Sequence, residues 1–237
     1  MFRHLRHIGD LIRKKRLVDP ARPFTDARFV VMDTELTGLD EKRDSIVSIG
    51  AVRMTGGVID LGDTFYQLVN PDTALSASSV VIHEITPSEV AAKPPIDAVL
   101  AEYLAYASDD ILIGHFVSLD LAFLNREMRR IFKHELRNPV IDTLSIHEWL
   151  SRRLPPRACF TAPPLGYRLY DIVKGFDIPV NVAHNAIADA YTTAQLFQRL
   201  LPLLAEAGII TLGDLLRIGT PFKGNDGLAV SGEFSNF

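Results

Sequence analysis

Four acidic residues and one histidine are the side chains of this chain that are most suited to chemistry. Asp33 and Glu35 occur in FVVMDTELTGLD, Asp120 in IGHFVSLDLAFLNREM, and His184 and Asp189 in HNAIADAYTTAQLF. Each group adjoins an apolar run typical of a core strand or helix. Four carboxylates brought together in one fold would repel one another strongly unless a cation neutralised them. Oxygen ligands of this kind suit Mg²⁺ or Mn²⁺, so the sequence predicts a divalent-metal site.

The first motif reads as the end of a strand. Because side chains alternate along a strand, Asp33 and Glu35 should point to the same face of the sheet. The apolar residues 29–32 precede them, which favours a buried position over an exposed one. A turn containing Gly38 follows, and its backbone can approach a ligand closely. An Asp-x-Glu alone is more often structural, but this context favours a functional pair.

The other two motifs place their acids at the starts of helices. Asp120 opens a helix, where an acid can equally serve to favour the helix dipole. Phe116 and Leu119 flank it and suit either the core or the wall of a pocket for a base. On one helix His184 and Asp189 would lie about 140° apart. They converge only if His184 lies in the loop entering the helix and Asp189 in its second turn, where the histidine can act as a general base.

The elements that must position these residues alternate between apolar runs and amphipathic segments. This order predicts an α/β fold, a mixed sheet with helices on its faces. Strands are expected at 27–35, 45–54, 58–69, 110–114 and 140–142, and helices at 86–91, 96–108, 121–132, 144–153, 169–175, 186–205 and 211–218.

Composition narrows the class of protein. The 237 residues are 47% hydrophobic, enough for a large core, and the single Cys159 cannot form a disulfide within the chain. These features, with no apolar run long enough for a membrane span, predict a cytoplasmic protein without a membrane partner. The net charge of −4 argues against broad coating of nucleic acid, although an enzyme could still grip a strand end.

The three motifs, in this order, resemble the histidine-bearing branch of the DEDD superfamily of 3′–5′ exonucleases, which includes the epsilon proofreading subunit of bacterial replicative DNA polymerase. DTELTGLD resembles the first motif of that family, GHFVSLDLAFL the second and HNAIADAYTTAQLF the third. Residues 48–52, 83–86 and 142–144 resemble stretches between the motifs. The likeness covers roughly residues 28–204.

The resemblance implies a ribonuclease H-like fold, with a mixed five-stranded sheet flanked by helices, and phosphodiester hydrolysis with two divalent ions, Mg²⁺ or Mn²⁺. By similarity, Asp33 would bridge both ions, and Glu35 and Asp189 would complete one site. Asp120 would support the second ion through water. His184 would deprotonate the attacking water.

It also implies a way of holding the substrate. The backbone at Leu36 and Thr37 would bind the terminal 3′-OH, and Leu39, Phe116 and Leu119 would flank the last base. Phe116 stands where the family usually has Asn, and Leu119 where it usually has an aromatic residue. In the third motif, Asn185 replaces the common Arg. None of these departures removes a carboxylate or the histidine.

The expected activity is release of nucleoside 5′-monophosphates from the 3′ end of single-stranded or frayed DNA, beside a DNA polymerase or another repair protein. An exoribonuclease that trims RNA or short oligoribonucleotides is the alternative enzyme. A catalytically silent nucleic-acid-binding module of a polymerase complex, and a chance motif set on another α/β hydrolase, are alternatives of different classes.

The chain divides into three predicted parts. Residues 1–24 form a basic, helical N-terminal arm, residues 25–206 the exonuclease domain, and residues 207–237 a partly flexible C-terminal extension. Residues 1–17 carry six Lys or Arg against Asp10 alone. The basic, proline-rich residues 152–164 are expected to form an ordered loop or flap.

Overall fold

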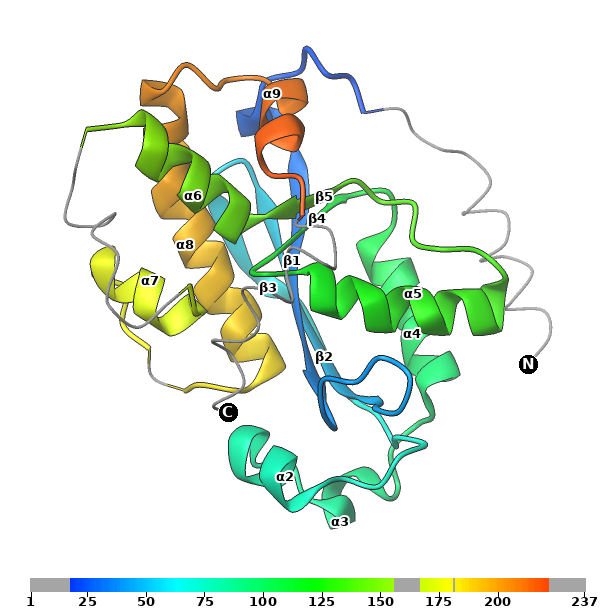
Figure 1. Cartoon of the computed structure of the whole chain (residues 1–237). Helices are drawn as coiled ribbons and strands as arrows, with labels where there is room; N and C mark the ends of the chain where they lie inside the picture. Colours follow the sequence, from blue (N-terminus) through cyan, green and yellow to red (C-terminus); the bar gives the residue numbers. More distant parts are fainter. Residues whose placement is uncertain (1–17, 156–166, 181, 222–237) are drawn as a thin grey trace.

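The computed structural model describes residues 18–155, 167–180 and 182–221 and is built around one mixed five-stranded sheet (Figure 1). The strands lie in the order β3-β2-β1-β4-β5. β1, β2 and β3 form an antiparallel meander, whereas β4 and β5 run parallel to β1. The predicted fold class is therefore confirmed. The strands are β1 (Arg28–Leu36), β2 (Ile46–Thr55), β3 (Val58–Leu68), β4 (Ile111–Gly114) and β5 (Val140–Asp142).

Helices cover both faces of this sheet. α4 and α5 lie on one side of it, and α6, α7 and α8 on the other, while α2 and α3 lie beyond the lower end of β1 (Figure 1). The helices are η1 (Phe24–Asp26, a 3-10 turn), α2 (Ala77–His83), α3 (Pro87–Val90), α4 (Ile96–Ala107), α5 (Ser118–Phe132), α6 (Thr143–Arg153), α7 (Leu169–Gly175), α8 (Ala186–Glu206) and α9 (Leu212–Ile218).

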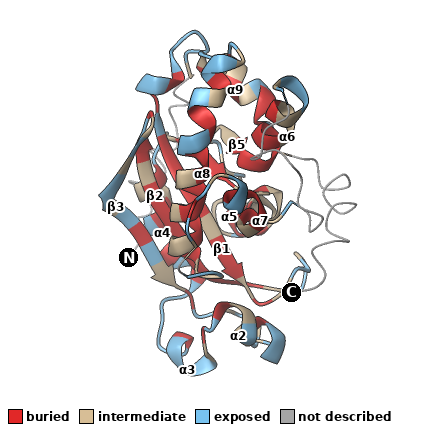
Figure 2. Cartoon of the chain, turned by 90° about the vertical axis from the view of Figure 1, so that its left-hand side faces the viewer, coloured by how far each residue is buried: buried red, intermediate tan, exposed pale blue. Residues whose placement is uncertain are grey.

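The central strand β1 contributes to two apolar cores. Phe29 and Val31 pack in the cluster that includes α6, α8 and α9, and Val30 and Met32 in the cluster that includes α4 and α5. All four side chains are at most 1% exposed, and Figure 2 shows the strand as buried. The unbroken apolar run of the sequence thus reflects burial on both faces. The same alternation assigns Asp33 and Glu35 to the α8 side of the sheet.

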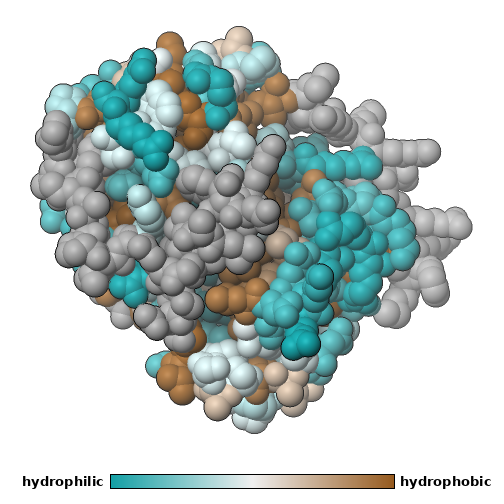
Figure 3. All heavy atoms as spheres, in the orientation of Figure 1, coloured by the Kyte–Doolittle hydropathy of each residue, from teal (hydrophilic) through white to brown (hydrophobic). Residues whose placement is uncertain are grey.

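The helix α5 shows the amphipathic pattern that the sequence predicts. Phe123, Leu124 and Met128 are buried against the sheet, whereas Arg129 and Arg130 are exposed. Figure 3 shows the outer side of this helix as a hydrophilic surface. The helix begins at Ser118, three residues earlier than expected, so its first turn lies closer to the end of β4.

A glycine lets the first turn of α8 lie directly on β2. Gly50 of β2 pairs with Asp33 of β1, and the first turn of α8 lies directly over it. A Cβ at Gly50 would lie 2.2 Å from the carbonyl carbon of Ala186 and 2.3 Å from the nitrogen of Ile187. The helix therefore packs against bare strand backbone. This close approach brings Asp189, in the same first turn, beside the end of β1.

Some expectations differ from the structure or lie outside it. The helix α2 was not predicted; its start is fixed by Ser76, whose side chain accepts the N–H of Ser79, a short cap that apolar periodicity does not reveal. The N-terminal arm up to residue 17, most of the loop at 152–164 and the tail beyond residue 221 lie outside the described residues.

The C-terminal helix α9 packs into the main body. Leu212 and Leu215 belong to the same apolar cluster as α8, and Thr211 forms a bridge with Pro23. The division of the chain into three parts, with boundaries at residues 24 and 206, stays a prediction. Within the described part of the chain, no helix has both the length and the apolarity needed to cross a membrane.

Replacing Gly50 with alanine tests this packing. The added Cβ would overlap backbone atoms that cannot rotate away, so we expect Gly50→Ala to lower the free energy of unfolding by about 1–3 kcal/mol. Gly62→Ala is the matched control, because it lies in β3 and its Cβ would find its nearest neighbour, Asp60 Oδ1, at 3.4 Å. Chemical denaturation of both variants measures the difference. Equal stability of the two would contradict the close packing of α8 on β2.

Candidate active site

Three carboxylates converge where β1 ends and α8 begins. Asp33 and Glu35 of β1 and Asp189 of α8 each offer an oxygen, and these atoms all lie within 4.8 Å of one another. Glu35 and Asp189 are buried and Asp33 is half-buried. The alternation of β1 turns both of its acids toward α8, as the sequence predicts. Asp189 lies in the first turn of α8, not in the second turn as expected.

Asp120 approaches from the other side of β1. Its Oδ1 accepts hydrogen bonds from the backbone N–H of Thr34 at 3.0 Å and from the Thr34 hydroxyl at 2.6 Å. Thr34 points to the α5 side because it alternates with Asp33 and Glu35. Asp120 is thus fixed to the strand between the two acids, and lies outside the tight group of three.

The electrostatics of the site oppose four negative charges. Burial raises the pKa of Glu35 to about 8, with Asp189 and Asp120 adding to the shift. Burial also raises the pKa of Asp120 and of Asp189, each to about 6, against the hydrogen bonds that stabilise their charged forms. The pKa of Asp33 is raised well above its usual value by burial and by the neighbouring carboxylates, Asp120 first. Without a cation, the site therefore retains protons near neutral pH.

The donor set fits a hard divalent cation. All the available ligands are carboxylate oxygens, which Mg²⁺ and Mn²⁺ prefer. Within the described residues, Asp189 Oδ1 is a buried oxygen with no hydrogen-bond partner. An unpaired buried acceptor is costly unless something binds it. A cation among Asp33, Glu35 and Asp189 would satisfy this oxygen and neutralise the repulsion.

His184 lies in the loop that enters α8, as the spacing predicts. Its backbone has a left-handed φ of 56°, and its N–H donates to the Tyr170 hydroxyl at 2.7 Å. Burial, and then Arg168, lower the pKa of its imidazole, which favours the neutral form that can accept a proton. Asn185, where the family commonly has Arg, caps the helix by accepting the N–H of Ala188.

The predicted substrate-binding residues divide into exposed and packed positions. Leu39 is 55% exposed. Leu36 and Leu119 are partly buried against the α4/α5 core, and Phe116 against the α8 core. Phe116 also has a left-handed φ of 51°, and its N–H donates to Asp142 Oδ1 at 2.9 Å. Leu39 is therefore the member of this group with the largest surface free for a ligand.

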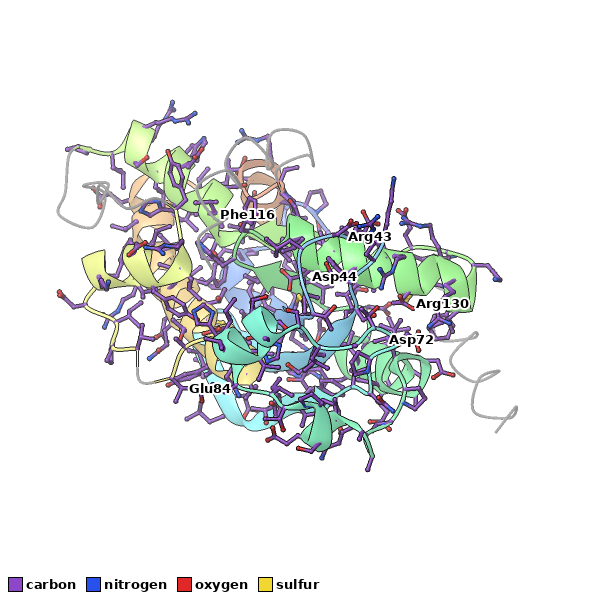
Figure 4. The ribbon with its side chains drawn as sticks, turned by 60° about the horizontal axis from the view of Figure 1, so that its bottom comes forward. Arg43, Asp44, Asp72, Glu84, Phe116 and Arg130 are labelled. Carbon is purple, nitrogen blue, oxygen red and sulfur yellow. The ribbon has the colours of Figure 1, made fainter. Side chains whose placement is uncertain are left out.

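The loop after β1 is held by its own side chains. The Thr37 hydroxyl donates to Asp44 Oδ1 at 3.0 Å and accepts the N–H of Ser45 at 3.0 Å, while Asp44 Oδ2 accepts the N–H of Asp40. Figure 4, which brings this end of the sheet forward, labels Asp44 of this loop and Phe116 of the segment between β4 and α5. The Thr37 side chain thus stabilises the loop that carries Leu39, and the expected contact of the Leu36 and Thr37 backbone with a 3′-OH stays a prediction.

Two residues that support the site were not singled out for that role. Asp142, at the end of β5, accepts the N–H groups of Phe116, Val117 and Leu144 and so fixes the segment leading to Asp120. Tyr170 donates its hydroxyl to Asp189 Oδ2 at 2.7 Å. In the sequence Asp142 is notable for its family likeness alone, and no local pattern links Tyr170 to residues 14 and 19 positions further along the chain.

Comparisons with known proteins show which proteins this chain resembles. The model of the Exonuclease family, also named RNase T, matches residues 30–197. The DNA polymerase III subunit epsilon of Aquifex aeolicus is 32% identical over 176 residues, which are 74% of this chain and 81% of that protein. A DNA polymerase III PolC-type protein of Thermotoga maritima is 32% identical over 195 residues, 82% of this chain. The chain spans only 13% of that PolC-type relative.

Solved structures share the fold. Exonuclease X, in complex with 5′ overhanging duplex DNA, is 26% identical with a TM-score of 0.58, covering 81% of this chain and 99% of that chain. Exonuclease I of E. coli, in complex with a dT13 oligonucleotide, has a TM-score of 0.64 at 22% identity and covers 76% of this chain and 42% of that chain. The ribonuclease H-like fold expected from the motifs is confirmed by these neighbours.

The raised carboxyl pKa values predict an unusual pH dependence of stability. When a carboxyl has a higher pKa in the folded protein than in the unfolded chain, its ionisation lowers the stability of the fold. The stability is regained as the pH falls toward the unfolded pKa near 4, because the folded protein then binds the proton again. We expect the melting temperature of the metal-free protein in EDTA to rise as pH is lowered from about 8.5 to 6. This pH range is set by the pKa values of Glu35, about 8, and of Asp189, about 6.

The stabilisation of the protein by added Mn²⁺ should have the opposite dependence on pH. Because protons compete with the cation for the same oxygens, the gain in melting temperature from Mn²⁺ should be largest above pH 8 and shrink toward pH 6. The same scans on Asp189→Asn should show a flatter pH profile in EDTA and a smaller gain from Mn²⁺. A wild-type melting temperature that stays constant from pH 6 to 8.5, with an equal Mn²⁺ gain throughout, would refute this account.

Proposed function

This chain belongs to the exonuclease family, and from that premise we propose that it hydrolyses phosphodiester bonds from the 3′ end of single-stranded or frayed DNA. The observation that carries the proposal is the convergence of Asp33, Glu35 and Asp189 within 4.8 Å on a chain of this family. Buried charges in proteins are generally paired with an opposite charge or coordinate a metal.

The cofactors of this proposal are two divalent ions, Mg²⁺ or Mn²⁺. Bound there, they supply Lewis-acid stabilisation of the attacking and leaving oxygens of an in-line displacement. Asp33 would contribute to both ions, and Glu35 and Asp189 would complete one site. Asp120, whose carboxylate is fixed by Thr34, would support the other.

His184 is the proposed base. Its neutral imidazole would take a proton from the water that attacks the terminal phosphodiester. The bond between phosphorus and the 3′ oxygen of the preceding nucleotide then breaks, and a nucleoside 5′-monophosphate leaves. Exposed Leu39 offers an apolar surface against which the last base could pack, because burial of apolar surface is favourable whatever the base.

DNA is the substrate that the relatives favour. The polymerase III relatives and Exonuclease X in complex with duplex DNA support it. A DNA polymerase or another repair protein is the proposed partner, by the same likeness. Preference for RNA is the competing outcome of the test below.

The test is a gel time course on single strands with free or blocked 3′ ends, DNA and RNA in parallel, with Mg²⁺, Mn²⁺ or EDTA. We expect stepwise shortening of DNA from the free 3′ end, which a 3′ block or EDTA stops. Faster shortening of RNA would transfer the proposal to an exoribonuclease. No cleavage of either strand by folded, Mn²⁺-bound protein would favour a silent binding module.

Two variants test the proposed roles of Asp33 as a metal ligand and of His184 as the base. Asp33→Asn should abolish shortening while the protein remains folded, because it removes a charged ligand from the cluster. His184→Ala should lower the rate about 10²–10⁴-fold, the usual contribution of a general base. His134→Ala, at the far end of α5, is the matched control and should retain the wild-type rate. Wild-type activity of Asp33→Asn in Mg²⁺ would contradict the assignment of Asp33 as a metal ligand.

A further inference from the structure

Tyr170 of α7 joins two groups of the proposed active site through one hydroxyl. The hydroxyl donates to Asp189 Oδ2 and accepts the backbone N–H of His184, each at 2.7 Å. The tyrosine ring meets the His184 imidazole edge to face, with 5.2 Å between ring centroids and 81° between planes. The residue thus contacts the proposed base and a proposed metal ligand at the same time.

The first consequence concerns Asp189. The tyrosine occupies one oxygen, Oδ2, while Oδ1 is buried and has no hydrogen-bond partner in the described part of the chain. A carboxylate bonded through one oxygen has a restricted rotation about its side-chain bonds. Oδ1 is therefore the oxygen that Asp189 keeps available for a cation shared with Asp33 and Glu35. Hydrogen bonds of this kind orient metal ligands and raise their affinity.

The second consequence concerns His184. Its left-handed φ of 56° is unfavourable for a residue with a Cβ, and such a conformation persists where its surroundings impose it. The hydroxyl of Tyr170 bonds the N–H of this residue, and the aromatic ring limits where the imidazole can turn. The next residue, Asn185, caps α8, so the loop is held on both sides.

The helix that carries Tyr170 is anchored by other contacts. Leu169, Ile172 and Val173 of α7 are buried in the main core, which holds the helix against the sheet. The hydroxyl is therefore not required to hold α7 in place, and a phenylalanine would keep the ring and its packing. Removing the hydroxyl alone isolates what it does for Asp189 and His184.

We propose that Tyr170 is a positioning residue whose hydroxyl sets the metal affinity of Asp189 and the placement of His184 together. The part concerning His184 rests on the proposed function, whereas the part concerning Asp189 rests on the metal site alone. Because the hydroxyl contacts neither the 3′ end nor the leaving group in this proposal, it should govern turnover and metal binding, and not the affinity for DNA.

The test compares Tyr170→Phe with Tyr106→Phe. Tyr106 is the matched control because its hydroxyl also makes a 2.7 Å hydrogen bond, to the Asp63 carbonyl oxygen, on the other side of the sheet. Calorimetric titration with Mn²⁺ alone gives the dissociation constant. We expect Tyr170→Phe to raise it about 10-fold or more, the usual cost of removing a partner of a metal ligand. Tyr106→Phe should bind Mn²⁺ as the wild type does.

Steady-state hydrolysis of single-stranded DNA at saturating Mn²⁺ supplies the second measurement. Tyr170→Phe should lower kcat about 10–100-fold at unchanged KM, whereas Tyr106→Phe should keep both values. Wild-type Mn²⁺ affinity in Tyr170→Phe would overturn the proposal, even if its melting temperature fell, since that would indicate a purely structural role. If the wild type itself hydrolyses no DNA, the proposed function fails, but the Mn²⁺ titration still decides the role of Tyr170 toward Asp189.

Discussion

Repulsion among carboxylates at the end of β1 is the constraint on which the site depends. Two unit charges 4.8 Å apart repel by ~3.5 kcal/mol at an effective dielectric constant of about 20. Asp33, Glu35 and Asp189 present three such pairs, and Asp120 lies behind the same strand. Burial raises the pKa of all three carboxyls, and the neighbouring carboxylates raise the pKa of Asp33 and Glu35 further, so that the site retains protons. Near neutral pH a bound cation favours the fully ionised form of the site, so metal binding and proton release are linked.

The fold maintains this arrangement through backbone contacts. Gly50 lets α8 rest directly on β2, and the alternation of β1 sends its acids toward that helix and Thr34 toward Asp120. Phe116 and His184, in the segments that lead to Asp120 and Asp189, have left-handed backbone conformations. Each has its N–H bonded by a polar side chain, from Asp142 and Tyr170 respectively. Hydrogen bonds thus hold the segments that carry the site on both sides of β1, as preorganisation of a site requires.

Local patterns in the sequence were sufficient for most of the framework. The apolar run before Asp33 marked a central strand, and the five-residue spacing of His184 and Asp189 required the loop that the structure shows. Contacts between distant elements could not be read in this way. The pairing of Thr34 with Asp120 spans 86 residues, and that of Tyr170 with Asp189 joins two helices. Gly50 appeared only as part of a strand, because its role depends on what packs over it.

Anomalous X-ray scattering from crystals of the full chain grown with Mn²⁺ tests the central claim most directly. The account predicts a manganese peak bonded to oxygens of Asp33, Glu35 and Asp189, with Asp189 Oδ1 as the coordinating atom and Oδ2 still held by Tyr170. A second peak on the Asp120 side of Asp33 would agree with two ions. Protein saturated with Mn²⁺ that shows no peak among these three carboxylates would contradict the account.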